Sequence, residues 1–82
     1  MVKSKQQVQR ERWNKAVVTV WTASRRDADL SQGELAQKLG WSRDTVASLE
    51  AGRRKVEVSD VILLAAAVGV DAKVLFERIL RW

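Results

Sequence analysis

Apolar residues recur at steps of three and four along much of the chain, which is the spacing of one face of a helix. The first such stretch lies within residues 5–26 and carries Trp13, Val17, Val20 and Trp21. Residues 17–21 also have β-propensity and could form a strand. We predict a helix instead, because the flanking residues are helix formers and the chain offers no partner strand.

Capping and turn signals indicate two short helices in the middle of the chain. Ser31 and Glu34 have the spacing of a capping box, in which each side chain bonds the backbone amide of the other residue. Gly40 stands where a left-handed residue ends that helix, and Ser42 is a second N-cap candidate. Gly52 ends the following helix, so each helix has about eight residues and needs packing partners to be stable.

Two further helices are expected in the last part of the chain. The fourth covers residues 58–68, ends at Gly69 and presents a nearly all-apolar surface through Val58, Val61, Ile62, Ala65 and Val68. Asp71 caps a fifth helix, which reaches Trp82 and carries Val74, Leu75, Phe76, Ile79 and Leu80. Five helices with short loops and no strands predict an all-α fold.

Length and composition favour one globular domain, residues 1–82, with no catalytic, metal or cofactor site. Hydrophobic residues make up 46% of the 82 and charged residues 30%, a globular balance. The chain has no Cys and no His, which removes thiolate nucleophiles, imidazole bases and nearly every transition-metal site. The longest apolar run, residues 61–70, is too short to span a bilayer, and no signal peptide is recognisable. We therefore expect a cytoplasmic protein.

The excess of positive charge lies in the first half of the chain. The formal net charge is +5, and residues 1–30 hold seven basic and three acidic groups, whereas residues 59–82 hold three of each. Basic domains bind nucleic acid, anionic membranes or acidic proteins, although a solvated basic face needs no partner.

Residues 31–52, SQGELAQKLGWSRDTVASLEAG, resemble the helix-turn-helix of the Cro/cI repressors, also called the XRE type. Ala36 stands where two helices approach closely, and Gly40 stands at the tight turn between them. The inner face is supplied by Leu35, Leu39, Val46 and Leu49. The resemblance extends over roughly residues 12–80 and implies a compact five-helix, lambda-repressor-like domain, with its C-terminal helices within residues 57–82.

Some positions depart from the family pattern. Val56 and Glu57 stand where the family often has Pro and Ser or Thr, which predicts a looser or shifted turn into the fourth helix. Ala51 replaces a frequent Asn, and Trp41 is bulkier than the residue common in the turn.

The resemblance assigns the second helix of the motif to the DNA major groove. Arg43, at its start, is the residue we expect to read guanine. Asp44 accepts from cytosine N4 or serves only as a favourable charge at the helix N-terminus, and we leave these readings equal. Gln32 and the loop after Gly52 are expected at phosphates. Thr45 and Ser48 either reach bases or phosphates or are only small residues on the helix surface, and we weigh the two nearly equally. The complete set of expected DNA-binding residues is Gln32, Ser42, Arg43, Asp44, Thr45, Ser48, Arg53, Arg54 and Lys55.

The resemblance also pairs Arg25 with Glu50, a structural role. Trp13, Trp21 and Trp41 are expected in the core or at its rim rather than as a platform for bases. For the basic start of the first helix we favour a solvated stretch over a DNA-contacting arm; its members are Lys3, Lys5, Arg10 and Arg12.

These features favour a repressor-like, sequence-specific regulator that binds double-stranded DNA and acts by occupying an operator. One motif reads few base pairs, which suggests a homodimer on a palindrome. We place the dimer contact at Ile79, Leu80 and Trp82, with packing of Trp82 back onto Trp13 or Trp21 as the competing possibility. An antitoxin-like module with a protein partner is the alternative function, and a carboxylate enzyme is a poor third. A bacterial or phage-encoded protein associated with the nucleoid is expected.

Overall fold

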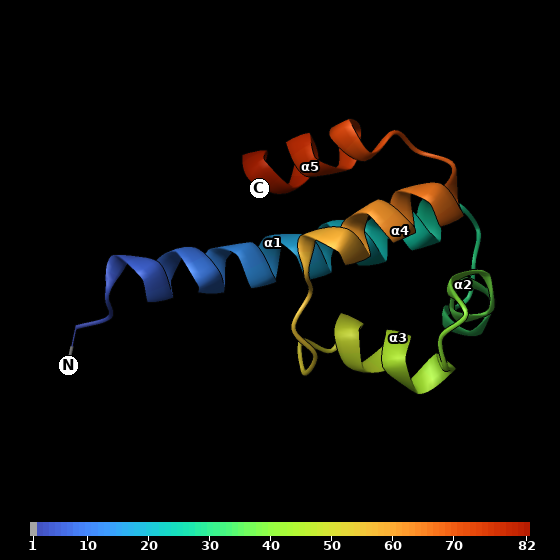
Figure 1. The fold of residues 1–82 in the computed structure, drawn as a ribbon, viewed down its shortest axis with the longest axis horizontal. Coiled ribbons are helices and arrows are strands. Elements are labelled where there is room, and N and C mark those ends of the chain that lie inside the picture. The colour runs from blue at the N-terminus through green and yellow to red at the C-terminus, as the bar shows by residue number, and fades with distance from the viewer. Residues whose placement is uncertain (1) are drawn as a thin grey trace.

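The computed structural model describes residues 2–82 as five helices and no strands, which confirms the predicted all-α fold. The helices are α1 (Lys5–Asp27), α2 (Gln32–Leu39), α3 (Arg43–Glu50), α4 (Val58–Val68) and α5 (Ala72–Arg81). Figure 1 shows α1 as a long rod with α5 above it and α3 below it, and α4 overlaps the second half of α1 in this view. No helix in the described part of the chain is both long and apolar enough to cross a membrane.

The helix-turn-helix is formed by α2 and α3, and its boundaries follow the capping signals. Ser31 Oγ accepts the backbone N–H of Glu34 at 3.0 Å, and Glu34 Oε1 accepts the N–H of Ser31 at 2.9 Å. Gly40 adopts the left-handed backbone conformation with φ of 72°, which residues that have a Cβ rarely adopt. The turn is closed by a 2.9 Å bond from the N–H of Trp41 to the carbonyl of Ala36.

One core joins all five helices. Trp21 is its largest fully buried side chain and is only 1% exposed. The other buried apolar residues come from every helix and from the loop before α4: Ala16, Val17, Val20, Leu35, Ala36, Val46, Leu49, Val56, Val61, Leu64, Ala65, Leu75 and Ile79. Short helices such as α2 and α3 are held in place by this packing rather than by their own propensity.

The turn into α4 is well defined, contrary to the looser turn expected from Val56 and Glu57. Val56 is buried, and its carbonyl accepts the indole N–H of Trp13 at 3.2 Å. The N–H of Glu57, the N-cap residue of α4, donates to Asp60 Oδ2 at 3.0 Å. An apolar anchor and a carboxylate three residues into the helix therefore replace the residues that are common in the family.

The nearly all-apolar surface of α4 is only partly buried. Val61 and Ala65 are buried together with Leu64, but Val58 and Ile62 are 57% and 51% exposed. Leu63 is exposed as well. A helix that is apolar all round cannot bury every side when it packs on one side of a domain, and the pattern does not show which side is left out.

The first eight residues of α1, from Lys5 to Arg12, extend beyond the body of the domain, and all are exposed (Figure 1). At 1.5 Å per residue this projection is about 12 Å long. Ser4 caps it, since its hydroxyl accepts the N–H of Gln7 at 3.2 Å and the Gln7 amide accepts the N–H of Ser4 at 2.9 Å. Lys3 and Glu11 also form an exposed ion pair of 2.8 Å.

Candidate functional site

The outward side of α3 carries the residues that sequence analysis expects at base edges. Val46 and Leu49 point into the core, which turns the opposite side of the helix to solvent. Arg43 and Asp44 are fully on this exposed side, and Ser48 is half-buried near its edge. Arg43 Cδ lies 3.8 Å from the position that a Cβ on Gly33 would occupy, so the stem of the arginine runs beside the start of α2.

Ser42 and Thr45 are tied to each other rather than left free. Ser42 Oγ accepts the N–H of Thr45 at 3.2 Å, and the two hydroxyl oxygens lie 2.8 Å apart. Thr45 is half-buried, on the flank of α3 rather than at its outermost line. These hydroxyls therefore fix the start of α3. To bond a ligand, each hydroxyl would have to share or give up the hydrogen bond that it makes with the other.

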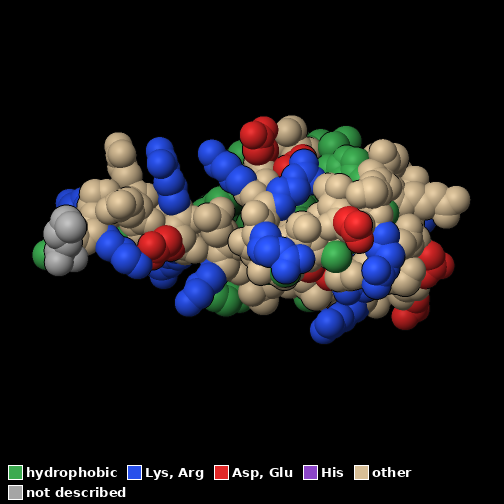
Figure 2. Space-filling view, turned by 90° about the horizontal axis from the view of Figure 1, so that it is seen from below, with side chains coloured by type: hydrophobic (Ala, Val, Ile, Leu, Met, Phe, Trp, Pro, Cys, Tyr) green, Lys and Arg blue, Asp and Glu red, His purple; other side chains and the backbone are tan. Residues whose placement is uncertain are grey.

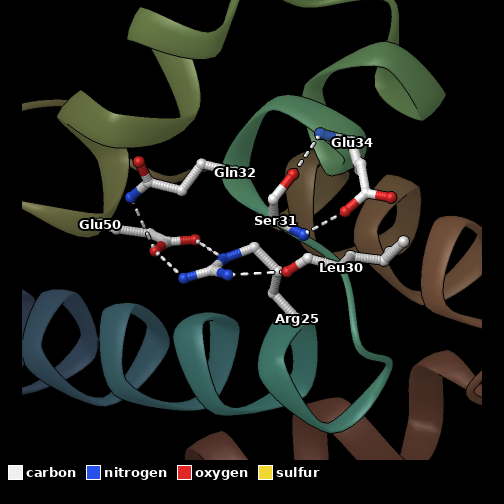
Figure 3. Close-up of polar contacts among 6 residues, drawn as sticks. All are labelled: Arg25, Leu30, Ser31, Gln32, Glu34 and Glu50. Atoms are coloured by element: carbon white, nitrogen blue, oxygen red, sulfur yellow. Dashed lines mark hydrogen bonds and ion pairs between the residues drawn. The ribbon is translucent and has the colours of Figure 1, made fainter.

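Arg25 and Glu50 form the expected ion pair, which ties α1 to α3 (Figure 3). Arg25 Nε and Nη2 donate to the two carboxylate oxygens of Glu50 at 2.7 and 2.9 Å. Arg25 Nη1 donates to the carbonyl of Leu30 at 2.8 Å. The side chains of the pair are only 9% and 7% exposed. The hydrogen bond with Glu50, supported by its charge, raises the pKa of Arg25 above its ordinary value even though burial opposes this change.

Gln32 extends this network to the start of α2. Its Nε2 donates to Glu50 Oε1 at 3.1 Å, so the side chain is directed by the same carboxylate that holds Arg25 (Figure 3). An amide nitrogen carries two protons, and one remains available to a phosphate oxygen. The sequence predicts Gln32 at the start of α2 but not its bond to Glu50, because nothing in the spacing links position 32 to position 50.

The capping box at Ser31 is an electrostatic feature of the same corner (Figure 3). The backbone N–H of Ser31 donates to the Glu34 carboxylate and lowers the pKa of that group below its ordinary value of 4.5, with a smaller contribution from the Ser31 hydroxyl. The carboxylate also lies in the first turn of α2, where a negative charge is favourable.

The three cations after α3 separate into two kinds. Arg53 and Lys55 are exposed, as a phosphate contact requires. Arg54 instead lies with its guanidinium carbon 4.5 Å from the ring centroid of Trp41. Trp41 in turn stacks on Trp21, with ring centroids 5.9 Å apart and planes 8° from parallel. The large residue in the turn, which departs from the family pattern, is therefore the surface on which Arg54 packs.

Three of the four tryptophans, Trp13, Trp21 and Trp41, occupy the core and its rim, as expected. Trp21 is buried, whereas Trp13 and Trp41 are half-buried. Trp82 is 51% exposed and borders hollows between α1 and α5, one of which Trp13 also lines. Among residues 2–82 the stacked rings are Trp13 with Phe76 and Trp21 with Trp41, so Trp82 stacks on neither expected partner. Ile79 is 4% exposed and belongs to the core, so its expected place in a dimer contact is wrong.

Comparison with known proteins identifies a family that covers most of the chain. The family model described as "Helix-turn-helix domain" matches residues 22–77. No curated protein sequence matches the chain at a significant level.

Three solved structures have a similar fold. The restriction-modification controller protein C.Esp1396I is 22% identical, with a TM-score of 0.77 over 84% of this chain and 92% of that one. The clp gene regulator ClgR from C. glutamicum is 20% identical, with a TM-score of 0.74 over 83% of this chain and 88% of that one. The hypothetical transcription factor NHTF from Neisseria is 29% identical, with a TM-score of 0.69 over 84% of each chain.

Proposed function

The chain belongs to the family of helix-turn-helix domains, which are DNA-binding modules, and we propose that it is a sequence-specific repressor that acts by occupying an operator. The observation that carries this proposal is the free guanidinium of Arg43 at the first position of α3. Arg43 is exposed and takes no part in the ion pairs of residues 2–82, which use Arg25, Lys3 and Arg81. The similar solved structures named as regulators support the same class.

In this proposal α3 lies in the major groove and Arg43 reads a guanine through O6 and N7. Ser42, Thr45 and Ser48 lie near the same groove, and Asp44 either accepts from cytosine N4 or only complements the helix dipole. Around the groove, Gln32, Arg53 and Lys55 contact phosphates. Arg54 packs on Trp41 and supports the loop from there.

Selection of bound duplexes from a random DNA library gives the recognition site and tests the proposal directly. Replacing Arg43 by Ala is expected to lower affinity for the selected site by about 1–3 kcal/mol and to relax preference at one base pair. Arg78→Ala is the matched control, because Arg78 is an exposed arginine on α5, away from α3. Absence of any enriched sequence would overturn the proposal, and an unchanged preference in Arg43→Ala would remove Arg43 from the readers.

Losing a phosphate contact is expected to change how affinity depends on salt concentration, but not which DNA sequence is preferred. Arg53→Gln should weaken binding to all duplexes alike and reduce the slope of log affinity against log salt by roughly one unit. An unchanged slope would mean that Arg53 is only solvated.

We also propose that the active species is a homodimer on a palindromic operator, with half-sites about 34–36 Å apart. Two exposed apolar surfaces support a contact between copies: the outer side of α4, with Val58, Ile62 and Leu63, and the chain end, with Leu80 at 79% exposure. Sedimentation without DNA tests the dimer, and Ile62→Lys and Leu80→Lys show which surface forms it. A monomer at micromolar concentration that binds single half-sites without cooperativity would contradict this proposal.

The same exposed apolar side chains favour one alternative, an antitoxin-like module that binds a partner protein and contacts DNA secondarily. A gel shift that requires the partner would distinguish it from the repressor. For both functions the proposed location is the bacterial cytoplasm, with the gene carried by a bacterium or a phage and the protein associated with the nucleoid.

A further inference from the structure

A basic groove runs between the first half of α1 and the loop that follows α3. Its polar lining includes Arg10 and Asn14 from α1 and Arg54 and Lys55 from the loop. No Asp or Glu lines it, so every charged residue of the groove is positive. We call it the α1 groove.

The α1 groove lies next to the basic surface formed by α3 and the loop after it. Figure 2 looks onto the face of α3 and shows Lys and Arg side chains along its whole length, from the region of α3 to the projecting end of α1. The nearest acid on the projection, Glu11, is already paired with Lys3. Positive charge without a neutralising partner next to a DNA-binding surface attracts phosphate.

Within the α1 groove, Arg10 and Lys55 are the free cations. Both are exposed, whereas the guanidinium of Arg54 is held over Trp41. Asn14 adds an amide one helical turn from Arg10. The indole N–H of Trp13 donates to the carbonyl of Val56, so it fixes the loop against α1 and keeps the two walls of the groove together.

We infer that the α1 groove binds a phosphate of the DNA backbone outside the stretch of base pairs that α3 reads, with Arg10 and Lys55 as the cations. The inference rests on the proposed DNA-binding function and replaces the solvated role expected for Arg10. Helix α1 carries Arg10 past the end of α3, so the contact widens the footprint without adding sequence preference.

Arg12 provides a matched control on the same helix. Two residues along a helix turn the side chain by about 200°, which places Arg12 on the other side from Arg10. There it borders a hollow with Ile79, Leu80 and Trp82 of the C-terminal end. Both arginines are exposed, and their replacement by Gln removes the same charge from the same projection.

The experiment measures affinity for the selected duplex at several salt concentrations for the wild type, Arg10→Gln and Arg12→Gln. We expect Arg10→Gln to lose about one unit of the log–log salt slope for each bound protomer, so the deficit per protomer shrinks roughly fourfold between about 50 and 200 mM salt, while Arg12→Gln keeps the wild-type slope. A duplex shortened on the flank beyond the end of α3 should abolish the difference between Arg10→Gln and the wild type. Circular dichroism confirms that all three proteins are equally folded.

The possible outcomes separate this inference from the proposed function. Equal slopes for the two variants, whether both unchanged or both reduced, overturn the α1 groove contact and leave DNA binding by α3 intact. A wild type that binds no duplex overturns both. Loss of slope in Arg10→Gln that persists on the shortened duplex places the phosphate elsewhere and also overturns the inference.

Discussion

The α2–α3 unit and the projecting start of α1 are both helical, yet their stability has different origins. In α2 and α3 the inner residues are buried, the ends are capped, and Arg25 with Glu50 ties the unit to α1. The projection has a capping box at Ser4 and the exposed Lys3–Glu11 pair, but no buried residue before Ala16. Eight-residue helices are thus held by tertiary contacts, whereas the projection depends on local interactions alone.

This difference shows what each region is suited to do. A reading helix needs fixed geometry, which burial and the ion pair supply. A phosphate contact needs charge within reach and tolerates a looser support. If the two regions differ in energy as they do in structure, changes in the α2–α3 unit should lower the free energy of unfolding more than changes in the projection.

Breaking the Arg25–Glu50 pair is expected to have the largest effect. Arg25→Met leaves the Glu50 carboxylate buried and releases the Leu30 carbonyl, which should lower the free energy of unfolding by about 3–5 kcal/mol. Denaturant titration of Arg25→Met, Glu50→Leu and the double variant gives the coupling. The double variant should be more stable than the sum of the single changes implies, and a coupling near zero would show that the pair contributes nothing.

Removing the cap of α2 should have a moderate effect. Ser31→Ala leaves the N–H of Glu34 without its acceptor and is expected to lower the free energy of unfolding by about 1 kcal/mol. Ser31→Thr retains a hydroxyl and is the control. If Thr is as destabilising as Ala, the loss does not come from the hydrogen bond.

Because of the capping box at Ser31 and Glu34, the stability of the folded protein should also depend on pH. Because the pKa of Glu34 is lowered in the folded state, its contribution to stability is complete above the ordinary value of 4.5 and is lost as pH falls through the folded value. Thermal unfolding of the wild type and Glu34→Gln should therefore differ most at neutral pH and converge in acid. A difference that stays constant with pH would contradict this assignment.

The same substitution at the start of α1 should have almost no effect on global stability. Ser4→Ala removes an equivalent cap, but the projection buries nothing, so the expected change is on the order of a few tenths of a kcal/mol. Far-ultraviolet circular dichroism should show lost helix while the unfolding midpoint stays fixed. A loss equal to that of Ser31→Ala would mean that the projection unfolds together with the core.

The sequence was sufficient for the features that arise from local rules. The spacing of Ser31 and Glu34, the glycine at position 40 and the serine at position 42 predicted the boundaries of α2 and α3 within a residue. The family resemblance supplied the long-range pair of Arg25 and Glu50. Each of these features depends on a pattern that lies within one segment of the chain or within a known motif.

What the sequence did not predict depends on packing between segments. The position of Arg54 on Trp41 requires the loop to return across the turn between α2 and α3, and nothing in three consecutive cations distinguishes the middle one. The exposure of Ile62 follows from which side of α4 meets the core. The α1 groove lies where the loop meets α1, a contact that includes the bond from Trp13 to the carbonyl of Val56.

The stack of Trp21 and Trp41 also makes the protein its own optical probe. Two indole rings that lie parallel and in contact interact with light as a coupled pair, and the guanidinium of Arg54 covers the outer ring. Any event that draws Arg54 away from Trp41 changes the surroundings of one member of that pair. Near-ultraviolet dichroism and tryptophan emission can therefore follow the loop after α3 in solution without an attached label.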